Sequence, residues 1–129
     1  KLKSLYICQP HFTSLQMLDA IKAADIVITR AGAHITYELL ALGKPAILIP
    51  LPFSYNQEQS HNAQVLADQG LGKIIFQSKL SPQLLLTTIL DMHQHLADFI
   101  KAGQTSVKLV KPDALSRIVA HILHYAPSR

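Results

Sequence analysis

Three polar side chains stand where chemistry is most readily placed: Glu38, Gln59 and Asn62. Each lies in a helix-like segment that follows an apolar, strand-like run, at residues 25–29 for Glu38 and 45–49 for the two amides. In an open α/β sheet, ligands bind outside the carboxyl ends of the strands, where helix N-termini present free N–H groups. The three side chains are therefore expected beside a polar, anionic ligand such as a sugar nucleotide.

The types of these side chains suit a sugar nucleotide. A carboxylate one helical turn beyond the loop, as at Glu38, can accept hydrogen bonds from two ribose hydroxyls. Gln59 and Asn62 are three positions apart and share one helix face, and their amides both donate and accept. The alternative for Glu38 is an exposed helix glutamate, and amides are also common on helix surfaces. The combination therefore says more than any one residue.

The histidines give no metal signal. His93 and His95 point to different helix faces, and His121 and His124 stand near a helix C-terminus, where they complement the dipole. No Cys or carboxylate partners stand at ligand spacing, so no metal site is predicted. His34 lies at the first loop-to-helix junction, where it either contacts a ligand or serves as a solvated cap.

Composition limits the class of protein. The chain has 129 residues, 49% hydrophobic and 16% charged, which suits one domain with a buried parallel sheet. No apolar run approaches the roughly 20 residues of a membrane span. The net charge of +4 comes from scattered Lys and Arg residues, so nucleic acid is not expected as a partner. The single cysteine, Cys8, excludes an internal disulfide and is expected to be buried on a strand.

Strands and helices alternate along the chain, which indicates an α/β fold with a Rossmann-like open parallel sheet and flanking helices. The expected strands cover residues 5–8, 26–29, 45–49 and 73–76, the second buried on both faces and the last at an edge. The first expected helix is capped by Thr13 or Ser14 and runs through residue 23. The next two cover residues 35–42, stopped by Gly43, and 57–69, stopped by Gly70. Ser81 and Pro82 begin a helix to about residue 92 that continues or restarts as far as a break at Gly103, and residues 114–124 form the last.

Several familiar motifs are missing. The chain has no Gly-x-Gly-x-x-Gly, no Walker loop and no Gly-x-Ser-x-Gly elbow. A glycine-rich phosphate loop is therefore not encoded in this segment, and an α/β-hydrolase is disfavoured.

A family resemblance rests on an ordered set of motifs. They are Arg30-Ala31-Gly32-Ala33, Glu38, Gly43-Lys44-Pro45-Ala46, Pro50, Gln59-x-x-Asn62-Ala63 and Lys111-Pro112-Asp113-Ala114. Over about residues 9–123 the chain resembles the C-terminal, donor-binding domain of the MurG glycosyltransferases. Those enzymes move N-acetylglucosamine (GlcNAc) from UDP-GlcNAc to the lipid-linked muramyl-pentapeptide precursor of peptidoglycan. The resemblance implies a glycosyltransferase B fold and an inverting transfer that needs no metal and no cofactor besides the donor substrate.

The resemblance also implies roles for particular residues. Glu38 would bind the ribose hydroxyls, and Gln59 with Glu58 would contact the hydroxyls of GlcNAc. The loop from Gly32 through Ala33 and His34 to Ile35 would lie against the diphosphate and sugar. Asn62 would support the loop, and Arg30 belongs to the same substrate-binding set. Glu58 departs from the family, which often has Gln or His there, so the departure bears on the choice of sugar.

The rest of such an enzyme is expected upstream of Lys1. Residues 1–129 would be a single donor-binding domain, a piece of a longer chain. The missing N-terminal domain would bind the lipid-linked acceptor and the membrane surface and supply the catalytic base. No catalytic residue is therefore expected here, and the fragment alone would be inactive. The full protein would be cytoplasmic and peripheral, at the inner face of the cell membrane.

Two kinds of alternative stay open. One is another UDP-sugar enzyme: a glycolipid glucosyltransferase, a subunit of a dolichol-linked GlcNAc transferase or an epimerase. The other is a non-catalytic module that docks on a partner through the apolar residues 84–86 and 89–90.

Overall fold

A parallel sheet of three strands forms the centre of the computed structural model, which describes residues 6–125. In sheet order the strands are β1 (Val27–Thr29), β2 (Ala46–Leu48) and β3 (Gly72–Ile74). Thr29 stands opposite Leu48, and Leu48 opposite Ile74, so all three strands end level. Their carboxyl ends thus form one edge, as predicted for an open parallel sheet.

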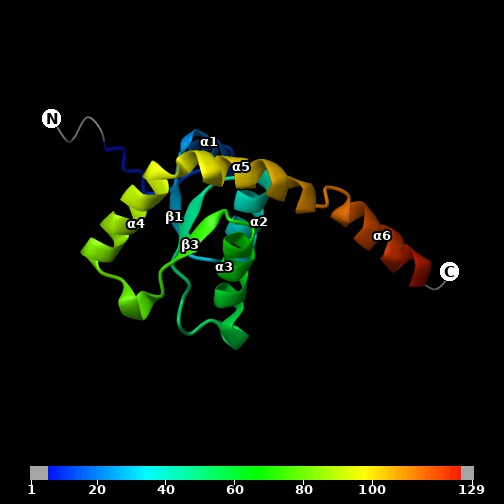
Figure 1. Ribbon diagram of the computed structural model, residues 1–129. Coiled ribbons are helices and arrows are strands. Elements are labelled where there is room, and N and C mark those ends of the chain that lie inside the picture. Colours follow the sequence, from blue (N-terminus) through cyan, green and yellow to red (C-terminus); the bar gives the residue numbers. More distant parts are fainter. Residues whose placement is uncertain (1–5, 126–129) are drawn as a thin grey trace.

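Helices cover both faces of the sheet (Figure 1). They are α1 (Ser14–Ala23), α2 (Ala33–Leu42), α3 (Glu58–Asp68), α4 (Pro82–Gln94), α5 (Leu96–Ser106) and α6 (Ala114–Tyr125), with short 3₁₀ turns η2 (Tyr55–Gln57), η3 (Gln77–Lys79) and η4 (Val107–Leu109). In Figure 1, α2 and α3 lie on one side of the strands and α4 lies on the other. The helix α6 extends away from this body.

Alternation along β2 explains the two layers. Leu48 packs in one core cluster with Leu39 of α2 and Leu66 of α3, whereas Ile47 packs with Met92 of α4 in the other. All five side chains are fully buried. Burial of each stabilises the fold by about 1.5–3 kcal/mol, so β2 anchors helices on both of its faces.

Local signals set the ends of several helices as predicted. Thr13 caps α1: its hydroxyl accepts from the N–H of Gln16, whose side chain accepts from the N–H of Thr13. Ser81 caps α4 by accepting from the N–H of Leu84, with Pro82 at the first helical position. Gly43 ends α2 with a left-handed φ of 60°.

The break predicted at Gly103 is wrong, because α5 runs through Gly103 to Ser106. A Cβ on Gly103 would lie 2.2 Å from the carbonyl oxygen of Gly43, and a Cβ on Gly43 would lie 2.8 Å from that of Gly103. Glycine therefore permits two backbones to meet here and does not end the helix.

Predictions at the first two strands also need correction. Tyr6, Ile7 and Cys8 form no strand, and Cys8 is exposed; Leu5 lies outside the described residues. Ile28 in β1 is 45% exposed, so this strand is not buried on both faces. The two errors have separate reasons: within residues 6–125 no strand pairs with the outer edge of β1, and the side chain of Ile28, which points to a face of the sheet, packs in neither core cluster.

At the other edge, the prediction of an edge strand is confirmed for β3, although the strand ends at Ile74. Phe76, predicted within it, lies beyond the strand and is 49% exposed. Phe76 precedes the turn η3, which begins at Gln77.

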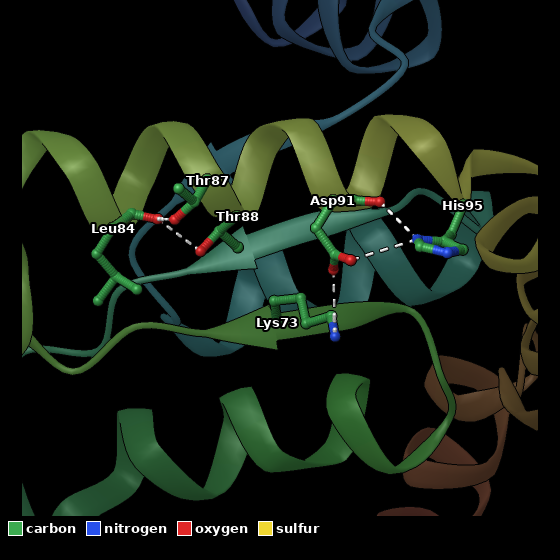
Figure 2. Close-up of polar contacts among 6 residues, drawn as sticks. All are labelled: Lys73, Leu84, Thr87, Thr88, Asp91 and His95. Atoms are coloured by element: carbon green, nitrogen blue, oxygen red, sulfur yellow. Dashed lines mark hydrogen bonds and ion pairs between the residues drawn. The ribbon is translucent and has the colours of Figure 1, made fainter.

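Helix α4 is seated on the sheet mainly by apolar packing. Its Leu85 and Ile89 pack against the core cluster of Ile47. Figure 2 shows Asp91 between Lys73 of β3, 3.6 Å away, and His95, whose Nδ1 is 3.3 Å from the carboxylate. The Lys73–Asp91 pair is half exposed and adds at most about 1 kcal/mol.

Other apolar residues of α4 face solvent. Leu86 and Leu90 are 56% and 59% exposed. Of the apolar residues 84–86 and 89–90 considered for docking, the sheet therefore covers only some. Several apolar side chains of α6, including Leu115, Ile118 and Ile122, are exposed as well. Among residues 6–125, no helix combines the length and the apolar character needed to cross a membrane.

Candidate functional site

The predicted site residues gather at the carboxyl edge of the sheet. Residues 30–32 join β1 to α2, and residues 49–57 join β2 to α3. Both loops start at strand ends that stand level with each other. Helices α2 and α3 also contact each other, so their N-termini belong to one region of the surface.

The N-terminus of α2 is free of side-chain caps. Gly32 is its N-cap, and the N–H and hydroxyl of Thr36 both donate to the carbonyl of Gly32, at 3.0 and 2.8 Å. A Cβ on Gly32 would meet no atom within 4 Å, so the space before the helix is open. The N–H groups of the first turn, with the positive end of the helix dipole, are thus available to an anion.

The first turn itself differs from the prediction. Helix α2 begins at Ala33, two residues before the expected start at Ile35, so Ala33 and His34 belong to the helix and not to its preceding loop. His34 is exposed and is not the cap residue considered for it. The difference arises because Gly32 supplies the N-cap without a side chain, and the sequence offers no polar cap there to recognise.

Glu38 lies in the second turn of α2 and is exposed. It borders a cavity of about 490 Å³ whose other walls come from α1 and from Phe12, two residues before the helix, with Leu15 and Leu18 among the lining residues. Within the described part of the chain, its carboxylate makes no hydrogen bond or ion pair. The cavity therefore combines an apolar wall with a free hydrogen-bond acceptor.

Gln59 and Asn62 connect the loops of this edge. The side-chain N–H of Asn62 donates to the carbonyl of Ala31 at 3.1 Å, so Asn62 ties α3 to the loop before α2. The side-chain oxygen of Gln59 accepts a hydrogen bond from the backbone N–H of Leu51 at 3.0 Å. The backbone N–H of Gln59 donates to the hydroxyl of Ser54. Within residues 6–125, the side-chain nitrogen of Gln59 and the side-chain oxygen of Asn62 make no hydrogen bond, so both are available to a ligand. A supporting role for Asn62 is what the family resemblance implies, whereas the contact of Gln59 with Leu51 is not evident from the sequence.

The loop before α3 has strained backbone. Asn56 and Gln57, neither of them glycine, have left-handed φ values of 48° and 56°. Such conformations cost about 1–3 kcal/mol each and cluster where a loop must present groups to a ligand. The hydrogen bonds of Gln59 to Leu51 and Ser54 hold the loop in this form.

Glu58 begins α3, where a carboxylate complements the helix dipole. It lines a hollow of about 250 Å³ together with Tyr55, Asn56, His61 and Asn62. This hollow shares no lining residue with the cavity beside Glu38. The predicted residues thus lie at one edge, but around two separate depressions.

Arg30 has a different setting from the other predicted residues. Its Nη1 donates to the carbonyl oxygen of Ile49 at 3.2 Å and to the side-chain oxygen of Gln77. Sequence reasoning missed Gln77, which carries no motif and stands 47 positions away.

Two further features of the molecule bear on the site. The described residues hold no group of three or more His, Cys, Asp or Glu side chains arranged for a metal ion. A cavity of about 310 Å³ lies at the opposite edge, beside Gly43 and Gly103, away from the strand ends named above. In that cavity the ammonium of Lys44 already donates to the carbonyls of Lys22 and Ala24.

The sequence is similar to those of several curated proteins. Two curated relatives are UDP-N-acetylglucosamine--N-acetylmuramyl-(pentapeptide) pyrophosphoryl-undecaprenol N-acetylglucosamine transferases. The one from Desulforamulus reducens is 42% identical over 103 residues, which is 80% of this chain and 28% of the relative. The one from Geobacter metallireducens is 36% identical over 107 residues, 83% of this chain and 29% of the relative. The chain therefore spans less than a third of these relatives.

A solved structure also resembles this chain. The crystal structure of Acinetobacter baumannii MurG matches with a TM-score of 0.77 at 28% identity, over 90% of this chain and 33% of that one. The match confirms the Rossmann-like α/β class and the glycosyltransferase B fold expected from the resemblance. The model of the glycosyltransferase family 28 C-terminal domain matches residues 9–118. The chain belongs to the glycosyltransferase family 28 C-terminal domain family.

Proposed function

We propose that this chain is the UDP-GlcNAc-binding part of an inverting glycosyltransferase. The whole enzyme would transfer GlcNAc to the lipid-linked muramyl-pentapeptide precursor of peptidoglycan, the reaction named for its relatives. One observation carries the proposal: the uncapped N-terminus of α2 opens at the carboxyl edge of the sheet, with Glu38 one turn further on. This arrangement suits a nucleoside diphosphate.

The diphosphate would lie before the first turn of α2. Gly32 leaves room for it, and the N–H groups of Ala33, His34 and Ile35 face it. Glu38 would accept hydrogen bonds from the ribose hydroxyls, beside the apolar wall that α1 supplies. Transfer by direct displacement at the anomeric carbon makes UDP the leaving group, and the helix dipole with these N–H groups stabilises its negative charge.

The sugar would lie toward α3. The free amide nitrogen of Gln59 can donate to a GlcNAc hydroxyl, and the carboxylate of Glu58 can accept from one. Asn62 supports both, because it fixes α3 against the loop that holds Ala31. A carboxylate at Glu58 only accepts when ionised, so it selects sugars with a hydroxyl pointing toward it.

The remaining parts of the reaction belong to residues outside this chain. The lipid-linked acceptor, the contact with the membrane surface and the catalytic base are assigned to an N-terminal domain of the longer relatives' kind. The chain alone would bind the donor without turning it over. The complete protein would work in the cytoplasm, peripherally at the inner face of the cell membrane. No metal is needed in this scheme, since α2 supplies the positive end that faces the diphosphate.

An NMR amide-shift titration with UDP-GlcNAc, UDP-glucose and UDP tests the proposal. Preference for UDP-glucose would favour a glycolipid glucosyltransferase. Absence of binding to any of the three would favour a non-catalytic docking module, for which the exposed Leu86 and Leu90 of α4 are the candidate surface.

A further inference from the structure

One side chain reaches the ends of all three strands. Arg30 directly follows β1, Ile49 directly follows β2, and Gln77 begins the turn η3 that comes after β3. Nη1 of Arg30 donates both to the carbonyl oxygen of Ile49 and to the side-chain oxygen of Gln77. We call Arg30, Ile49 and Gln77 the strand-end clip.

The strand-end clip fixes the first residue of each ligand loop. Arg30 is followed by Ala31, which is fully buried and whose carbonyl is held by Asn62. Ile49 is followed by Pro50 and Leu51, whose N–H is held by Gln59. Each loop is thus pinned twice: by Arg30 where it leaves the sheet, and by an α3 amide one or two residues later.

The chemistry of the guanidinium suits this task. It is planar, always charged and carries its donors in a rigid fork, so it fixes the directions of two acceptors at once. A lysine would keep the charge but would place its donors on a flexible stem. The same feature gives the clip a testable signature, because charge and geometry can be separated by substitution.

We propose that Arg30 is a positioning residue, which acts through Ile49 and Gln77 to hold the two ligand loops in register, and that it does not contact the ligand. The inference rests on the proposed function, since the loops are taken to bind a UDP-sugar. It assigns to Gln77, an exposed residue of a surface turn, a part in ligand binding.

The decisive variants are Gln77→Ala, Arg30→Lys and the double variant, with Ser78→Ala in the same turn as the matched control. Affinity for UDP is measured by titration under conditions where thermal unfolding curves show every variant folded. Loss of one charge-assisted hydrogen bond that orders a loop should weaken UDP binding by about 3- to 10-fold in either single variant. The double variant should be no weaker than Arg30→Lys, because both changes break one unit. Ser78→Ala should bind as the unchanged chain does.

Amide shifts of the ligand-free protein give an independent readout. In Gln77→Ala, the amide signals of Gly32 and Leu51 should move, although both residues are far from Gln77 in sequence. Equal UDP affinity of Gln77→Ala and the unchanged chain, together with weaker binding by Arg30→Lys, would mean that Arg30 contacts the ligand directly and would overturn the proposal.

Failure of the proposed function looks different. If the unchanged chain binds no UDP ligand, the proposed donor site is wrong, and the clip is judged on the ligand-free shifts alone. Unmoved Gly32 and Leu51 signals in Gln77→Ala would then overturn the clip as well.

Discussion

The side chain of Asn62 in α3 donates a hydrogen bond to the carbonyl oxygen of Ala31, 3.1 Å away and 31 positions earlier in the chain. Ala31 is fully buried, so without Asn62 its carbonyl would lose its side-chain partner. This contact joins the helix that carries the two amides to the loop that leads into α2. The candidate site is therefore assembled from two crossover units, and this hydrogen bond is one of the contacts that hold them together.

Replacement of Asn62 by Ala should loosen that junction. The lost hydrogen bond and the carbonyl left unpaired should lower the free energy of unfolding by about 1–3 kcal/mol. Affinity for UDP-GlcNAc should fall too, because the loop at Ala31 is no longer fixed. Denaturant unfolding and titration measure the two effects. Gln64→Ala on the same helix is the control: it removes only an exposed pairing with Asp68 and should change stability by a few tenths of a kcal/mol. Equal stability of the two variants would contradict the role given to Asn62.

Replacement of Glu38 by Ala tests the ribose contact. If the carboxylate accepts from ribose hydroxyls, UDP binding should weaken by about 1–3 kcal/mol, whereas the free energy of unfolding should hardly change for this exposed side chain. The matched comparison uses 2′-deoxy-UDP. This ligand should bind the unchanged chain more weakly than UDP does, and the difference between the two ligands should shrink in Glu38→Ala. A difference that persists in the variant would mean that another group reads the ribose.

Replacement of Gly103 by Ala should damage the fold. The new methyl group would lie 2.2 Å from the carbonyl oxygen of Gly43, so α5 and the end of α2 must move apart. Overpacking of this kind costs about 1–3 kcal/mol. Gln104→Ala, the next position of α5 and exposed, is the control for helix propensity and should be close to neutral. Thermal unfolding of both variants measures the difference, and similar midpoints would refute the close contact.

Replacement of Gly32 by Ala should leave the fold nearly unchanged but weaken the binding of UDP. No atom lies within 4 Å of the added Cβ, and the φ of −66° suits any residue, so stability should fall by about 1 kcal/mol or less. The methyl group would, however, fill the space proposed for the diphosphate. Affinity for UDP should therefore drop by about 10-fold or more, roughly 1.4 kcal/mol. A variant that is folded and binds UDP normally would remove the diphosphate from the N-terminus of α2.

Local rules account for what the sequence predicts well. Thr13, Ser81 and Gly43 act on groups within four or five residues of themselves, so their cap roles follow from the sequence alone. The predictions for Cys8 and Ile28 are wrong, because burial depends on which distant segments cover a strand.

For the candidate site too, the sequence predicts the features set by local spacing and misses those set by contacts between distant residues. The distance from the apolar runs predicts that Glu38 and Gln59 lie in helices that follow strand ends, and the structure has them in α2 and α3, which follow β1 and β2. The hydrogen bond from Arg30 to Gln77 and the contact of Gly43 with Gly103 join residues 47 and 60 positions apart. No periodicity or motif reports such pairs, since each exists only once the chain has folded.

The most direct test of the donor site is the NMR titration of this chain with UDP-GlcNAc, UDP-glucose and UDP. Even millimolar binding, about −4 kcal/mol, moves amide signals measurably. The proposed function predicts shifts concentrated at residues 32–38 and 57–62, larger for UDP-GlcNAc than for UDP-glucose. Shifts that gather at the opposite edge around Gly43 and Gly103, or no shifts with any of the three ligands, would contradict a UDP-GlcNAc site at the carboxyl ends of the strands.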